Sequence, residues 1–274
     1  MNDTSIVRGA IRSNNRMWWC LYYDELYEID DLQCTYLRDA GEAFYNCAQA
    51  IGHVDDKILD FIDDYYWPDI APAVYTDPAA PQQLVPMLVA RDYREIRAER
   101  EYWYRCDVLQ GGWQPPIVKV APERVSVVRV DPKGNELHDF VQINKVASNL
   151  PDNVASGLYR NLSTRSLRDV ELFLYLALLD GRPAATRAVG ICREMAFFAE
   201  GGTMPSARRL GLYSFLTDLG LHTAAASGAR VAFATTGEDT NARPALQKMG
   251  FEIAWTRDYF RRSATDRPTD ERNL

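Results

Sequence analysis

The segment TMPSARRLGLYSFL, residues 203–216, combines residue types that can bind phosphate groups. Arg208 and Arg209 precede an apolar helical pattern, and Gly211 lets a ligand approach the backbone closely. The residues that share one face of this pattern are Leu212, Leu216, Leu219 and Thr223. The spacing predicts a helix that begins near Arg208 or Arg209. Because the first amides of a helix have no partner within it and its dipole attracts negative charge, the segment is predicted to bind a pyrophosphate.

A second segment, TNARPALQKMGF at residues 240–251, predicts a short helix from about Thr240 to Met249, which Gly250 follows. Each segment also has a plainer interpretation. The first could be a capped surface helix, and the second an ordinary helix with a glycine C-cap. The order and separation of the two segments along one chain favour the interpretation that they form a ligand-binding site.

The elements that must position these segments follow the break GGWQPPI at residues 111–117. The pattern predicts a strand over 124–130 and two helices within 138–166, divided at Pro151. Two apolar strands over 170–192 are joined by a hairpin at Asp180 and Gly181. Further strands are predicted at 194–202, 229–235 and 251–260. The fold class is therefore α/β (α+β), with a mixed, mostly antiparallel twisted sheet flanked by helices.

Residues 1–115 are interpreted as a helix-rich accessory domain. Leu26 to Cys47 carry apolar residues at steps of three and four, which predicts an amphipathic helix, and residues 54–66 predict a shorter one. The alternative is a degenerate second copy of the fold of residues 118–262. The accessory domain is preferred, because no hairpin signal is evident in this part. The polar tail, residues 263–274, is predicted to be disordered.

Composition limits the function classes. The net charge is −7, with a balance of −9 over residues 1–70 and +2 over the rest, which argues against nucleic-acid binding. No apolar stretch is long enough for a membrane helix. The five scattered cysteines predict reduced thiols in a cytoplasmic protein, and the three isolated histidines argue against a metal site.

The two segments and the order of elements over 124–262 resemble the GNAT family of N-acyltransferases. Thr203, Pro205, Arg208 and Gly211 correspond to its coenzyme A-binding motif. Asn241, Gly250 and Phe251 match its closing signature. The resemblance implies that residues 118–262 form an acyl-CoA-binding catalytic domain, with acetyl-CoA or another acyl-CoA as co-substrate and no metal.

The resemblance also implies roles for particular residues. The backbone amides of the loop would hold the pyrophosphate, and its two arginines would add charge. These loop residues are Arg208, Arg209, Leu210, Gly211, Leu212 and Tyr213. Tyr213 departs from the family, which has a small residue there. The strand end at Phe197, Phe198 and Ala199 would pair with the pantetheine arm, and Asn241 would contact the cofactor or orient the splayed strands.

One departure concerns proton transfer. The family commonly has a tyrosine that protonates the departing thiolate, and this chain has Leu246 in its place. Ser206 and Tyr213 are hydroxyls nearby in sequence, but the acid is left unassigned. A base is also needed, because only a neutral amine attacks the thioester. Glu200 is the first candidate and Glu194 the second, with Asp239 as a third.

The sequence thus predicts an N-acyltransferase that moves an acyl group, acetyl in the simplest case, to the amine of a small molecule within a ternary complex. A homodimer is compatible with this prediction. Two alternatives stay open. In one, the acyl donor is the phosphopantetheine arm of an acyl carrier protein. In the other, the domain senses acyl-CoA without turnover, which the absence of the tyrosine favours.

Overall fold

A computed structural model describes residues 4–262, except 30, 38–45, 51, 67–72, 97–100, 109–112, 114–115, 165–169 and 238–239. The chain divides into two compact units. The first comprises residues 1–9, 23–101 and 256–274, and the second comprises residues 10–22 and 102–255. The predicted boundary at 111–117 therefore falls inside the second unit, and residues 10–22 belong with sequence far downstream of them. The tail predicted to be disordered, 263–274, lies outside the described residues.

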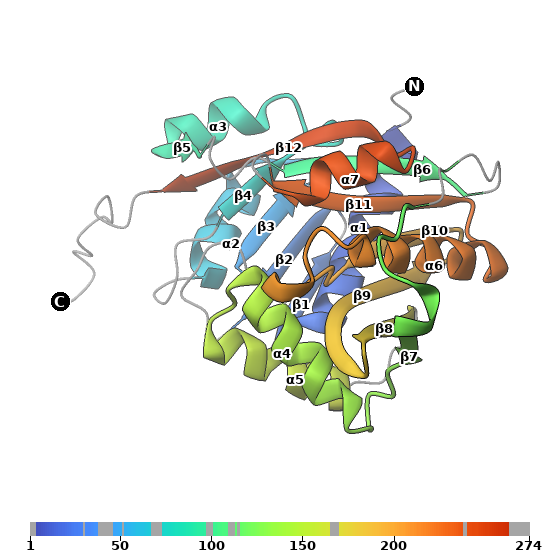
Figure 1. Ribbon diagram of the computed structural model, residues 1–274. Helices are drawn as coiled ribbons and strands as arrows, with labels where there is room; N and C mark the ends of the chain where they lie inside the picture. The colour runs from blue at the N-terminus through green and yellow to red at the C-terminus, as the bar shows by residue number, and fades with distance from the viewer. Residues whose placement is uncertain are drawn as a thin grey trace. The chain divides into compact units, whose positions relative to one another are not determined.

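The second unit has the elements predicted for residues 124–262, except that most of the last strand belongs to the first unit. Its strands lie in the order β6-β11-β10-β9-β8-β7 (Figure 1). They are β6 (Glu101–Asp107), β7 (Val125–Arg129), β8 (Glu171–Leu179), β9 (Arg182–Cys192), β10 (Met195–Ala199) and β11 (Val231–Gly237). Its helices are α4 (Glu136–Ser148), α5 (Asp152–Thr164), α6 (Leu212–Ala226) and α7 (Ala242–Lys248). The predicted hairpin at Asp180 and Gly181 is confirmed, and both residues have the positive φ, 51° and 75°, that such a turn requires.

Strand direction explains the connections in this unit. Strands β7 to β10 pair antiparallel, whereas β10 and β11 pair parallel. Parallel neighbours need a crossover, and α6 provides it. Leu212, Leu216 and Leu221 of α6 are fully or almost fully buried in one core with Phe198 of β10. The first half of the predicted apolar face, Leu212 and Leu216, is thus buried. Farther along the helix the buried residues are Gly220, Leu221 and Ala224, whereas the predicted Leu219 and Thr223 are half-buried.

Helix α1 (Thr4–Leu21) supplies residues 10–21 to the second unit. Asn161 of α5 is 2 % exposed, and its amide donates to the backbone carbonyls of Leu21 at 3.3 Å and Tyr22 at 2.8 Å. A Cβ atom on Gly190 of β9 would lie 2.7 Å from the Met17 side chain, so the glycine permits α1 to approach the sheet. These contacts fix the end of α1 in the second unit.

The first unit contains strands where a helix was predicted. Its elements are β1 (Glu25–Ile29), β2 (Leu32–Tyr36), β3 (Cys47–Ala50), α2 (Asp56–Tyr66), β4 (Ala73–Thr76), α3 (Leu84–Ala90), β5 (Tyr93–Glu95) and most of β12 (Glu252–Arg262). The helix predicted over Leu26 to Cys47 is wrong, whereas the helix over 54–66 is confirmed as α2. Leu32, Cys34 and Tyr36 alternate along β2 and pack in one core. Their spacing of two fits a strand, whereas Leu32 and Tyr36 also fit the helical steps of three and four, and pairing with β1 and β3 decides for the strand.

Two stretches of the chain, β1 to β5 and β8 to β12, repeat one order of elements: three strands, a helix, a strand, a helix and a strand. The last strand of the second stretch, β12, belongs mostly to the first unit. In both units the first three of these strands pair antiparallel. The strand after the first helix then pairs parallel with the third, as β4 does with β3 and β11 with β10. The description of residues 1–115 as helix-rich is therefore corrected. This order favours the alternative that they hold a second copy of the fold.

The Asn161 contacts generate a prediction about stability. Asn161→Ala removes two donors from buried carbonyls, so the free energy of unfolding should fall by about 1–3 kcal/mol. Ser163→Ala is the matched control on the same helix, because the Ser163 hydroxyl bonds at an exposed position; its effect should stay below about 0.5 kcal/mol. Urea unfolding measures both. Equal effects of the two variants would contradict the anchoring of α1 by Asn161.

Candidate active site

The parting of β10 and β11 creates the candidate site. Their parallel pairing runs from Met195 and Val231 to Phe198 and Ala234. Strand β10 ends one residue later at Ala199, while β11 continues to Gly237. Beyond Phe198 and Ala234, the backbone N–H and C=O groups of β10 and β11 no longer pair with each other. Of the residues predicted to pair with the pantetheine arm, Phe197 and Phe198 are still paired with β11, and only Ala199 lies beyond this pairing.

A β-bulge bends the chain at the end of β10. Ala188 is opposite Ala199, but Ala185 is opposite Thr203, so the β10 side has one extra residue. Glu200 and Gly201 together therefore oppose Arg187 of β9. Glu200 has a left-handed φ of 50°. Bulges of this kind redirect side chains, and this one turns the chain away from β11 toward the loop before α6.

Glu200 has the environment of a proton acceptor that works near neutral pH. Burial raises the pKa of its carboxyl to about 7. A hydrogen bond with the Tyr22 side chain and the charge of Arg187 act in the opposite direction and limit the rise. A carboxyl with this pKa is partly ionised at pH 7 and can both accept and release a proton.

Arg187 connects the bulge with the first turns of α6. It is 3 % exposed, and its guanidinium donates to the Thr217 hydroxyl at 2.5 Å and lies 4.2 Å from the centre of the Tyr213 ring. Thr217 in turn donates to the Tyr213 carbonyl at 2.9 Å. Gly201 leaves room for the guanidinium, since a Cβ atom there would lie 2.5 Å from it. The bulge and the helix start are therefore held together by buried polar contacts.

The loop before α6 differs in one respect from its prediction. The helix begins at Leu212, not near Arg208 or Arg209, because Arg209 and Gly211 have left-handed φ values of 65° and 90°. A 3-10 turn, Pro205–Ala207, precedes them. A Cβ atom on Gly211 would lie 2.4 Å from the Ile117 carbonyl oxygen. Backbone direction and this contact both require glycine there.

The start of α6 has free amide groups for an anion. Its first backbone bond joins the Phe215 amide to the Gly211 carbonyl at 2.9 Å, which leaves the amides of residues 212–214 without a partner within the helix. No side chain caps the helix and its first turn has no acidic residue. Arg208 and Arg209 are exposed beside it. The free amides and the arginines on which the predicted anion site depends are therefore present, although the helix begins about three residues later than expected.

The remaining residues that the sequence singled out differ in their position relative to the end of β10 and the start of α6. Glu194 is exposed in the turn before β10 and forms an ion pair with Arg230 at 3.5 Å. It lies at the opposite end of β10 from Glu200, about 20 Å away at the usual rise of a strand. Asn241 is exposed directly before α7, and Leu246 is fully buried within it. Asp239 lies outside the described residues.

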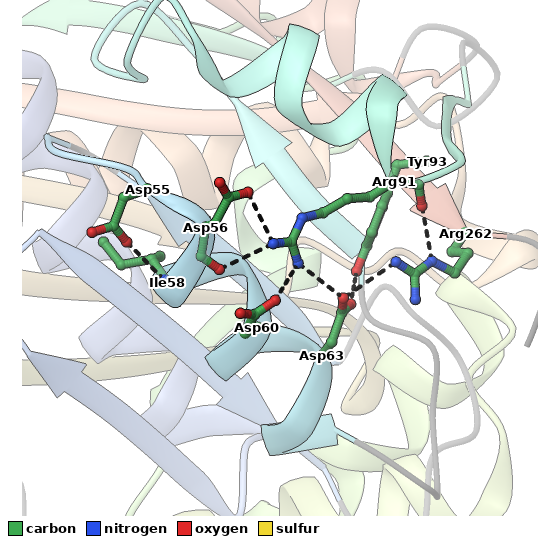
Figure 2. Close-up of polar contacts among 8 residues, drawn as sticks. All are labelled: Asp55, Asp56, Ile58, Asp60, Asp63, Arg91, Tyr93 and Arg262. Carbon is green, nitrogen blue, oxygen red and sulfur yellow. Dashed lines mark hydrogen bonds and ion pairs between the residues drawn. The ribbon is translucent and has the colours of Figure 1, made fainter. Parts of the chain in front are cut away.

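The corresponding helix start in the first unit is blocked. Helix α2 follows β3 as α6 follows β10, but Asp55 caps it by accepting from the Ile58 amide at 2.9 Å. Figure 2 shows that Asp56 and Asp60 also lie there and bind Arg91, at 3.0 Å and 2.8 Å. Carboxylates occupy the end of the helix that would otherwise attract an anion. This end of α2 therefore has no place for a pyrophosphate.

Sequence reasoning missed Arg187 and Tyr22. Arg187 had a signal, because it is one charged residue within the apolar strand AATRAVGIC. Tyr22 had none, since nothing local to it indicates contact with residue 200. Among the described residues, no group of three acidic, cysteine or histidine side chains could hold a metal ion. Within the same ranges, none of the helices has the length and apolar character needed to span a membrane.

Comparison with known proteins agrees with this geometry. Residues 124–241 match the family model of the acetyltransferase (GNAT) domain. No curated protein matches the chain. A GCN5-related N-acetyltransferase from Kribbella flavida has 20% identity and a TM-score of 0.63, with 92% of this chain and 95% of that one covered.

Two further solved structures have a similar fold. A tandem GNAT protein from the clavulanic acid biosynthesis pathway has 15% identity and a TM-score of 0.61, with coverage of 87% and 79%. A GNAT-family protein from Novosphingobium aromaticivorans, described as a putative acetyltransferase, has 17% identity, a TM-score of 0.56, and coverage of 93% and 97%. At these identities the likeness concerns the fold alone, and it extends over both units. Residues 124–241 are thus similar to the acetyltransferase (GNAT) domain, and the chain as a whole shares the fold of these structures.

Proposed function

We propose that the protein transfers an acyl group, acetyl in the simplest case, from acyl-CoA to the amine of a small molecule. The observation that supports this most is the position of Glu200. Its buried carboxyl has a pKa of about 7 and lies at the bulge where β10 parts from β11. A proton acceptor at this point would be next to the strand end that is proposed to bind the thioester arm.

Donor binding would rest on the loop before α6. The residues proposed to hold the pyrophosphate by backbone amides and charge are Arg208, Arg209, Leu210, Gly211, Leu212 and Tyr213. The uncapped amides and the absence of acidic residues in the first turn fit such a group. Ala199, which follows the paired residues Phe197 and Phe198 at the end of β10, would pair with the arm of the donor. The bound donor supplies an activated thioester carbonyl, toward which backbone amides of the strand end can be directed.

Glu200 would act as the general base. The attacking amine forms the new C–N bond to the carbonyl carbon, and its proton passes to the Glu200 carboxylate. Collapse of the tetrahedral intermediate then breaks the C–S bond, and sulfur leaves with the electron pair. Tyr22 and Arg187 hold the carboxylate in place and favour its charged form. Glu194, the second candidate, is too far from the loop to share this role.

The first unit is proposed to serve the acceptor and not the donor. Residues 1–70 carry a charge balance of −9, which disfavours a polyanion, and the start of α2 is blocked by carboxylates. Asn241 retains its proposed role at the donor site. A homodimer remains compatible with the proposal. The four described cysteines, Cys34, Cys47, Cys106 and Cys192, are buried free thiols, as expected for the proposed cytoplasmic location.

Two other functions use the same site. An acyl carrier protein could present the thioester, in which case Arg208 and Arg209 would face an acidic protein. A sensor of acyl-CoA would bind the donor without turnover. The buried carboxyl with a pKa near 7 favours catalysis, because a sensor has no need of a proton acceptor at the strand end.

Glu200→Gln tests the reaction. The amide keeps the shape but accepts no proton, so amine-dependent release of coenzyme A should fall by about 10²- to 10⁴-fold with donor affinity unchanged. In the wild type, kcat/KM should rise with pH through about 7 as Glu200 loses its proton. Glu194→Gln is the control and should be fully active. Turnover by the Glu200→Gln variant at the wild-type rate would eliminate Glu200 as the base. Tight donor binding by the wild type without release across an amine panel would establish the sensor.

The wild type and the Glu200→Gln variant also allow a check without turnover. A carboxyl whose pKa is raised from 4.5 to about 7 binds its proton more tightly in the folded state. The folded wild type should therefore lose stability relative to Glu200→Gln as pH rises from about 4.5 to 7, by about 3 kcal/mol in total. Urea unfolding at several pH values measures this difference. A difference that does not change with pH would mean that Glu200 has an ordinary pKa.

Charge reversal tests the donor site. Arg209→Glu places a negative charge beside the proposed pyrophosphate, so the Kd for coenzyme A should rise about 10-fold or more at low salt. Arg193→Glu is the matched control, because Arg193 is likewise exposed with a left-handed φ, 55° against 65° for Arg209. Arg193 lies in the turn between β9 and β10, and the Kd of the Arg193→Glu variant for coenzyme A should equal that of the wild type. Calorimetry measures both, and equal values in all three proteins would refute the site.

The blocked start of α2 predicts the stoichiometry. One chain should bind one coenzyme A, because only α6 among these two helix starts has uncapped amides and no acidic side chain in its first turn. Titration calorimetry should give about one site per chain for the wild type. Two sites of similar affinity would show that the first unit also binds the donor.

A further inference from the structure

Arg187 is a buried cation in the middle of an apolar strand. Its neighbours on β9, Ala188 and Val189, are fully buried and apolar. Taking a guanidinium out of water costs free energy unless hydrogen bonds and an opposite charge offset the loss of hydration. The Nε atom of Arg187 is buried and has no hydrogen-bond partner in the described part of the chain. Packing alone therefore does not account for an arginine at this position.

One side of the guanidinium is held against the start of α6. Thr217, which accepts its hydrogen bond, is fully buried, and the half-buried ring of Tyr213 covers it. Both residues belong to the first two turns of the helix that follows the proposed donor loop. The contact also gives a reason for Tyr213, which stands where the GNAT family has a small residue. A small side chain would leave this face of the guanidinium without a cation–π partner.

The other side of Arg187 faces the bulge. Glu200 and Gly201 together oppose it across β9 and β10. A Cβ atom on Gly201 would lie 2.5 Å from its Nη1 atom and 2.8 Å from its Cζ atom. Among the described residues, two charged or titratable groups act on Glu200: Tyr22 of α1 through a hydrogen bond, and Arg187 through its charge. One guanidinium therefore contacts the helix start and lies beside the proposed base.

We propose that Arg187 is a positioning residue that couples the donor loop to the base. This rests on the proposed function, in which residues 208–213 bind the donor and Glu200 takes the proton of the amine. The guanidinium is planar and rigid, so the contacts with Thr217 and Tyr213 also fix the position of its charge relative to Glu200. Loss of Arg187 should therefore change two properties together: the affinity for the donor and the pH at which the base works.

Arg187→Met tests both ends of this connection. Arg187 favours the ionised form of Glu200, so without it Glu200 should keep its proton to a pH about one unit higher. At saturating donor, kcat/KM for the amine should fall about fivefold relative to wild type at pH 7 and return to within about twofold at pH 9. The ratio to wild type cancels the ionisation of the amine itself. The Kd for coenzyme A should rise about 3- to 10-fold, because the helix start is less firmly held.

Two further variants separate charge from packing. Arg187→Lys retains the charge but not the planar fork, so it should restore the pH midpoint and not the donor affinity. Arg193→Met is the control on the same hairpin, because Arg193 is exposed in the turn between β9 and β10. This variant should equal the wild type in the pH midpoint and in the Kd.

The possible outcomes separate this proposal from the proposed function. If kcat/KM of Arg187→Met falls by the same factor at every pH, the role of Arg187 is structural and the proposal is overturned. An unchanged Kd for coenzyme A would overturn the coupling to the donor loop. If Arg187→Met does not fold, a wild-type Kd in Arg187→Lys has the same consequence. If instead the wild type binds no coenzyme A, or its pH midpoint near 7 persists in Glu200→Gln, the proposed function itself fails and the coupling falls with it.

Discussion

The separation of β10 from β11 is the structural constraint from which the rest of the active site follows. Parallel strands that stay paired use all of their facing backbone groups, so a ligand can pair with β10 only where β11 has moved away. The bulge at Glu200 and Gly201 lies directly after this point and places two residues opposite Arg187. Glu200, the proposed base, is therefore next to the last residues of β10 that pair with β11.

Burial gives this arrangement its chemistry and also its cost. The carboxyl of Glu200 has a raised pKa because the gain from Tyr22 and Arg187 does not compensate for desolvation. Arg187 is itself buried, with Thr217 and the Tyr213 ring as its close neighbours. If the interactions with Tyr22 and Arg187 had fully offset the desolvation, the pKa of Glu200 would have stayed low, and its carboxylate would be a weak base. Incomplete compensation instead leaves a group that exchanges a proton near neutral pH, as acyl transfer to an amine requires.

The duplication shows how one framework supports two different helix starts. Helices α2 and α6 follow the third strand of their units in the same way. Asp55, Asp56 and Asp60 with Arg91 satisfy the start of α2 internally, whereas α6 begins after Gly211 with free amides. In the first unit, Asp63 extends this network by accepting hydrogen bonds from Tyr93 at 2.6 Å and Arg262 at 3.2 Å (Figure 2). Its ion pairs lie within that unit, and donor binding is proposed for the other.

The sequence by itself determined the parts that local chemistry controls. The loop with Arg208, Arg209 and Gly211, the hairpin at Asp180 and the fold class of the second unit follow from turn residues and from hydrophobic periods long enough to be unambiguous. Tertiary structure decided the rest. Residues 26–47 fit two periods, and only pairing between strands made them β-structure. The contacts of Glu200 with Tyr22 and Arg187 depend on long-range packing, so its pKa could not be deduced from its neighbours in sequence. Periodicity reports which face of an element is buried, whereas the identity of the partner across that face is a property of the folded chain.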